Sequence, residues 1–163
     1  MENNIVRNIY VLETGFLRKG LTSGWVGPLV LTRHVVYFIS LKEIDIKKQL
    51  SLSLVAGWKA FPAVQHAIEK AIEAADKDLN NLENFTGDLD NLVNEKENSL
   101  KINKTEIASC KISKKYYPYG CIAIKTKGKT KHEISYAEPN EINPKIISFM
   151  DLNGYPLKVG WGV

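Results

Sequence analysis

The segment Lys114-Lys115-Tyr116-Tyr117-Pro118-Tyr119-Gly120 holds the residues best suited to binding chemistry, in a predicted loop between two strands. Tyrosine rings suit a membrane interface, and each lysine near an anionic lipid surface adds about 1 kcal/mol of attraction. The same side chains can stack on single-stranded bases. The simpler interpretation is a Pro-Gly turn whose tyrosines pack back on the domain. The candidate binding residues here are Lys114, Lys115, Tyr116, Tyr117 and Tyr119.

Two other groups of basic residues are candidates for binding. Lys125, Lys127, Lys129 and Lys131 are expected to share a face or to line a strand end, where they can meet a phosphate or an acidic protein. The alternative is that they keep an exposed sheet soluble and discourage pairing at its edge. Arg18 and Lys19, in a glycine-rich turn, are candidates for contact with lipid phosphates.

The charge is unevenly distributed along the chain. Residues 99–132 carry nine lysines against one acid, Glu106, whereas residues 43–98 carry six basic and eleven acidic residues. Such asymmetry can indicate an anionic partner. It is equally consistent with two halves that each interact with water, or with each other.

No catalytic, metal-binding or cofactor motif stands out. Nucleophilic catalysis needs a nucleophile, a base and an orienting group held together. The three histidines, His34, His66 and His132, fall on separate predicted elements, and neither Cys110 nor Cys121 is near a histidine in sequence. No paired Cys or His spacing suits zinc, and no glycine-rich phosphate loop follows a strand. We therefore expect no catalytic residue, no metal and no cofactor.

Runs of β-branched and aromatic residues predict strands in the first part of the chain. We expect strands over Ile5–Thr14, Ser23–Leu31 and Val35–Ser40, with Gly15–Gly20 as a turn or a short strand. Thr32-Arg33-His34 is predicted to connect the second and third of these.

A helical pattern separates this block from a second block of strands. Apolar residues from Phe61 to Leu82 recur at spacings of three and four, which predicts an amphipathic helix within Trp58–Phe85. A shorter helix is expected over Asp88–Lys96. Two helices joined by a short loop suggest an antiparallel hairpin, whose apolar stripe must bury against the strands or against a second copy of the chain.

Alternation of apolar and polar residues returns after Leu100. It predicts a hairpin within Ala108–Tyr136 that has one apolar and one charged face. Asn143-Pro144 is expected to begin a C-terminal helix that ends before Gly154. The class expected from these patterns is α+β, mainly β.

The length and composition favour one cytoplasmic domain. A chain of 163 residues with 44% hydrophobic residues can bury a core without disulfides. Its two cysteines are expected to stay reduced. No secretory signal and no membrane span is expected from the pattern.

The residues of both strand blocks resemble GRAM and bacterial PH-like domains. Gly27–Ser40 (GPLVLTRHVVYFIS) is similar to a strand pair of those domains, Leu100–Ile107 to a later step, and Ile122–Tyr136 to their last hairpin. The resemblance covers residues 10–44 and 99–151. At the position where the family pattern has an arginine, this sequence has Val35. A stretch of about 50 residues stands where the family has a short loop.

The resemblance implies a fold and a kind of function. The fold would be a seven-stranded sandwich or partly open barrel with a C-terminal capping helix, as a single domain over 1–163 with a helical insertion at 45–98. The function would be non-catalytic binding of a protein partner or of an anionic membrane surface, with self-association through the insertion. Nucleic-acid binding through the basic sheet, and a small enzyme of unrecognised type, remain alternatives.

Overall fold

The fold, seen in a computed structural model, is α+β and mainly β, which confirms the predicted class. The structure describes residues 8–20, 23–45, 61–77, 86–116, 118–160 and 163. Within these ranges, nine strands form one antiparallel-rich sheet that is not closed into a barrel, and three α-helices pack against it. The PH-like resemblance implied seven strands, whereas the described residues form nine.

Along the chain, strands come before, between and after the helices. The strands are β1 (Ile9–Arg18), β2 (Ser23–Thr32), β3 (Val35–Phe38), β4 (Lys42–Asp45), β5 (Leu100–Asn103), β6 (Ile107–Tyr116), β7 (Tyr119–Thr126), β8 (Lys131–Tyr136) and β9 (Leu157–Val159). The helices are α2 (Pro62–Lys77), α4 (Gly87–Glu95) and α5 (Pro139–Leu152), with a 3₁₀ turn, η4, at Lys104–Glu106.

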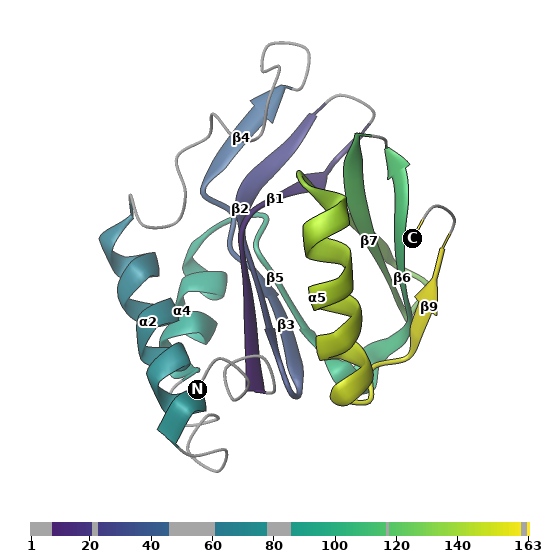
Figure 1. The fold of residues 1–163 in the computed structure, drawn as a ribbon. Helices are drawn as coiled ribbons and strands as arrows, with labels where there is room; N and C mark the ends of the chain where they lie inside the picture. Colours follow the sequence, from purple (N-terminus) through teal and green to yellow (C-terminus); the bar gives the residue numbers. More distant parts are fainter. Residues whose placement is uncertain (1–7, 21–22, 46–60, 78–85, 117, 161–162) are drawn as a thin grey trace.

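The sheet joins segments that are distant in sequence. Its order is β5-β3-β2-β1-β8-β7-β6-β9. Strand β4 pairs with the part of β2 that β3 does not cover. Strand β1 therefore links the two blocks of strands, and β5 returns to β3 after both helices of the 45–98 region (Figure 1). Strand β9 adds to β6 in parallel, whereas the other pairs are antiparallel.

Pro28 explains why the pairing of β2 changes halfway along the strand. Proline has no N–H to donate to a ladder and is placed where pairing breaks. On one side, the register with β1 shifts between Leu12 and Gly15, opposite Pro28. On the other side, the partner of β2 changes from β3 to β4, and the Pro28 carbonyl accepts the Ile39 N–H at 3.1 Å.

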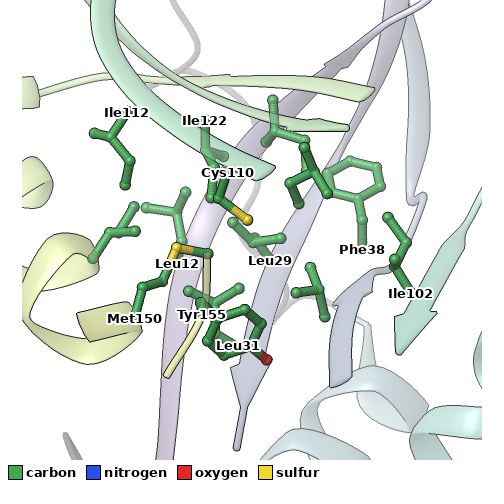
Figure 2. Close-up of a cluster of buried hydrophobic side chains, with 14 of the residues drawn as sticks. Leu12, Leu29, Leu31, Phe38, Ile102, Cys110, Ile112, Ile122, Met150 and Tyr155 are labelled. Carbon is green, nitrogen blue, oxygen red and sulfur yellow. The ribbon is translucent and has the colours of Figure 1, made fainter. Parts of the chain in front are cut away.

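The main core lies between the two halves of the sheet and α5. Side chains from β1, β2, β3 and β5 meet those of β6, β7 and β8 in one cluster, which α5 covers with Ile146, Phe149 and Met150. Figure 2 shows Leu29, Cys110 and Met150 from three distant segments within this cluster. The shared cluster means that the sheet bends around a single core.

The helices α2 and α4 cover the opposite face of the sheet at the β1–β3 end (Figure 1). The predicted stripe is confirmed within α2, because Val64, Ile68 and Ala75 are buried against Ile9, Val30 and other residues of the sheet, while its last part, through Leu82, lies outside the described residues. The two helices are antiparallel: Lys70 pairs with Asp88 at 3.2 Å, and residues nearer the start of α2 face residues nearer the end of α4. The stripe is thus used inside the chain, and self-association stays a prediction.

A hydrogen bond ties α4 to the sheet. The Tyr37 hydroxyl donates to Asp90 Oδ1 at 2.8 Å, and the Lys101 ammonium lies 2.9 Å from the same carboxylate. Burial, followed by the bond to Asp90, raises the pKa of Tyr37. The phenol therefore stays protonated and keeps donating at any physiological pH.

Three local expectations need correction. The first strand continues through Arg18, because the shift near Gly15 lets β1 keep pairing with β2 beyond the glycine, so Gly15–Arg18 is strand, the second of the two predicted alternatives, and belongs to the first strand. Helix α5 begins at Pro139, where a missing N–H costs nothing, and it includes Pro144 in its interior. Ala108 is exposed because a register shift between Ile107 and Ser109 removes it from the predicted alternation.

Candidate functional site

The outer face of the β6–β8 sheet is hollowed. The inward residues of these strands belong to the main core, so their neighbours in sequence point to the opposite face. There they surround a hollow of about 460 Å³. We call it the lysine hollow; its lining residues are Ser109, Lys111, Ser113, Cys121, Ala123, Lys125, Lys131 and Glu133.

Small side chains among long ones create this shape. Ala123 lies between Lys111 and Glu133 in the middle row of the lining, and the buried Ser113 and Cys121 are direct neighbours at one end of it. None of these small side chains is large enough to fill the space above the sheet. Lys125 and Lys131 face each other across β7 and β8 at the rim.

The electrostatics of the hollow favour an anion. Lys111, Lys125 and Lys131 line it against a single acid, Glu133, whose carboxylate lies 2.8 Å from Lys131 Nζ. Lys158 on β9 is paired in register with Lys111 and therefore projects to the same face. A ligand with negative charge would be attracted by this excess of ammonium groups.

The predicted lysine and tyrosine loop is not gathered into one patch where its side chains are described. Lys114 Nζ donates to Asn140 Oδ1 at 2.6 Å, on the side of the sheet that faces α5. Tyr119 is half-buried on the other side, against Phe16, Val26 and Ile44. The side chains of Lys115 and Tyr116, and all of Tyr117, lie outside the described residues.

The remaining predicted site residues are spread over three places. Lys125 lies at the rim of the lysine hollow, whereas Lys127 and Lys129 are exposed in the turn between β7 and β8. Arg18 ends β1. Lys19 follows it and holds its ammonium 5.1 Å from the centre of the Trp25 ring.

Sequence reasoning missed two of the basic residues on this face. Lys111 alternates with inward-facing Cys110 and Ile112, so its direction was readable, but not its proximity to Lys125 and Lys131. Lys158 gave no signal, because its position depends on parallel pairing between β6 and β9.

The groups that catalysis or metal binding would use lie apart. His34 is exposed in the β2–β3 connection, His66 is exposed on α2, and His132 is half-buried opposite Ile124. Burial raises the pKa of the Cys110 thiol to about 12, so this thiol is a poor nucleophile. Among the described residues, no three His, Cys, Asp or Glu side chains are grouped to hold a metal ion.

His132 is expected to make stability depend on pH. Burial lowers its pKa below the ordinary 6.5, so the unfolded chain binds the proton more readily than the folded protein. The free energy of unfolding should therefore fall as the pH drops below the ordinary histidine pKa of 6.5. Urea unfolding at about pH 7.5 and about pH 5.5 should show a smaller drop for His132→Gln than for the wild type.

His66→Gln provides the matched control for this experiment, because His66 is exposed on α2. It should retain the pH dependence of the wild type. Equal pH dependence in His132→Gln and His66→Gln would contradict the assignment.

Comparison with known proteins adds no relative. The chain matches no family model and is similar to no curated protein at a significant level. Of the helices in the described residues, none has the length and apolar character needed to span a bilayer.

Proposed function

We propose that the protein is a non-catalytic binding module that holds an acidic segment of a partner protein at the lysine hollow. The observation that carries this proposal is the combination of an anion-attracting rim with a recessed floor of small side chains. Specific recognition commonly uses a concave site with a few placed polar groups.

An acidic protein segment suits the hollow better than a membrane surface. A flat array of headgroups cannot reach the buried side chains of Ser113 and Cys121, whereas a side chain can enter the hollow above them. Two residues of the predicted membrane loop are also engaged elsewhere, Lys114 with Asn140 and Tyr119 with Phe16. Membrane and nucleic-acid binding are therefore alternative outcomes of the test.

A PH/GRAM-like relationship is part of the same proposal. It is supported by a predominantly antiparallel sheet around one core, and by α5, which covers that core near the end of the chain. The helices α2 and α4 would then be the insertion at 45–98, in a single domain over 1–163. The two buried free cysteines are compatible with a cytoplasmic location.

The test uses a fluorescein-labelled octapeptide of alternating glutamate and serine, measured by fluorescence anisotropy at low salt. The double substitution Lys111→Gln/Lys125→Gln should weaken its binding about tenfold, since each partly exposed ion pair contributes up to about 1 kcal/mol. Lys127→Gln/Lys129→Gln removes the same charge from the neighbouring turn and should leave affinity within about twofold of the wild type.

Vesicles of phosphatidylserine and a single-stranded oligothymidine serve as competitors. The proposal expects neither to displace the peptide at equal charge concentration. Unchanged peptide affinity in the Lys111/Lys125 variant would refute the site. Stronger binding of vesicles or of oligothymidine, lost in that variant, would instead assign the hollow to a membrane or to nucleic acid.

A further inference from the structure

Strand β1 has an open edge over half of its length. One edge pairs with β2 over Ile9–Leu12 and again over Gly15–Arg18, with a register shift between the two stretches. The other edge pairs with β8 only at Phe16 and Leu17, so within the described residues Tyr10–Thr14 has no strand partner there. Backbone N–H and C=O groups on such an edge can bond to an added strand.

A groove of about 620 Å³ follows this edge and has α5 as its other wall. Tyr10–Thr14 forms one wall, and Ala137, Glu138, Glu141, Ile142 and Lys145 form the other. Glu138, Glu141 or Ile142, and Lys145 follow one another at intervals of three or four residues. They therefore lie along one side of the start of the helix. Figure 1 shows α5 running beside β1 in this region.

The base of the groove is apolar. Leu12 is buried and Ile142 is partly buried against the main core, while the Tyr10 ring lies 6.4 Å from that of Phe149. Burial, followed by the negative charge of Glu141, raises the pKa of Tyr10 to about 12, so its hydroxyl stays protonated.

The groove carries an excess of negative charge. Glu13, Glu138 and Glu141 line it against one cation, Lys145, whose ammonium pairs with Glu141 at 3.2 Å. Two carboxylates, those of Glu13 and Glu138, thus exceed the charge that Lys145 balances. The groove is on the α5 side of the sheet and is separate from the lysine hollow, which opens on the outer face of β6–β8.

We propose that this groove binds an extended segment of a partner protein that carries lysine or arginine, added as a strand to the open edge of β1. The backbone of the segment would pair with Tyr10–Thr14. Its basic side chains would meet Glu13 and Glu138, and its apolar side chains would cover Leu12 and Ile142. Recognition of this kind takes affinity from main-chain bonds and specificity from the side chains beside the edge.

The charge is tested with an octapeptide of alternating lysine and valine on the full chain. Its affinity, measured by fluorescence anisotropy, should fall about three- to tenfold in Glu13→Gln/Glu138→Gln, which removes two attractions of the size of exposed ion pairs. Glu97→Gln/Glu106→Gln removes two exposed carboxylates elsewhere and should change affinity less than about twofold.

Main-chain pairing is tested with the same peptide N-methylated at alternate residues, in both registers. One register should lose most of its affinity, because methylation removes the N–H groups that face β1. Bound unmodified peptide should also slow amide hydrogen exchange at alternate positions between Tyr10 and Thr14.

The results separate this inference from the proposed function. Lys111→Gln/Lys125→Gln should still bind the lysine–valine peptide, since that variant changes only the lysine hollow. Equal binding of both methylated peptides, or unchanged exchange in Tyr10–Thr14, would overturn strand addition. Unchanged affinity in the Glu13/Glu138 variant would overturn the basic segment as its ligand.

Discussion

Replacing Gly27 with alanine is expected to destabilise the protein by about 4 kcal/mol or more, a large share of the roughly 5 to 15 kcal/mol that stabilises a single domain. A Cβ at this position would lie 1.7 Å from the Ile39 carbonyl oxygen and 2.8 Å from its carbon. The obstacle is backbone, which cannot rotate away as a side chain can. It belongs to the segment that crosses from β3 to β4, fixed there by the Leu41 N–H, which donates to the Val26 carbonyl at 2.9 Å.

Gly87→Ala is the matched control for Gly27→Ala. Gly87 begins α4, and a Cβ there would have no neighbour within 4 Å. Because alanine favours helix over glycine, this variant should equal the wild type or exceed it by up to about 1 kcal/mol. Urea unfolding followed by circular dichroism measures both. A Gly27→Ala protein within about 1 kcal/mol of the wild type would contradict the expected clash.

Phe149→Ala is expected to cost about 3 to 5 kcal/mol, the range found when a buried phenylalanine is truncated. Phe149 is fully buried and joins α5 to the main core, with its ring 6.4 Å from that of Tyr10 on β1. Its loss would leave a cavity between the helix and the strand that links both halves of the sheet. The free energy of urea unfolding measures the effect.

Leu152→Ala tests whether this cost comes from burial rather than from any change in α5. Leu152 lies in the same helix and is 59% exposed, so its truncation should change stability by less than about 0.5 kcal/mol. If Phe149→Ala gives no folded protein, Phe149→Leu should be folded and about 1 to 2 kcal/mol less stable than the wild type. Equal stabilities for Phe149→Leu, Leu152→Ala and the wild type would contradict the packing described.

Local pattern was sufficient to predict the class of the fold and most of its elements. The apolar run after Ser23 and the stripe through Val64 and Ile68 each reflect which side of one element is buried, and that information is local. The helix at Gly87–Glu95 was likewise readable from its own residues. The pairing of Val35 with Asn103 was not, because it joins segments on either side of the helices.

The candidate site was only partly predictable, for a related reason. Alternation indicated the outward direction of Lys125 and Lys131, but the hollow depends on Ser113 lying beside Cys121 and on Ala123 lying beside Lys111 and Glu133. These placements are set by register across three strands, and the sequence alone does not fix them. The composition of the loop near Tyr119 predicted a binding site, although Tyr119 itself packs against the sheet.

The position of β1 at the centre of the sheet has a consequence for synthesis on the ribosome. Ser135, the neighbour of Phe16 in β8, is translated long after Phe16 itself. The nascent chain can form the meander of β1, β2 and β3 by itself, yet the apolar side facing α5 has no cover until that helix leaves the exit tunnel. We therefore expect this half-finished meander to be the species that chaperones engage during translation.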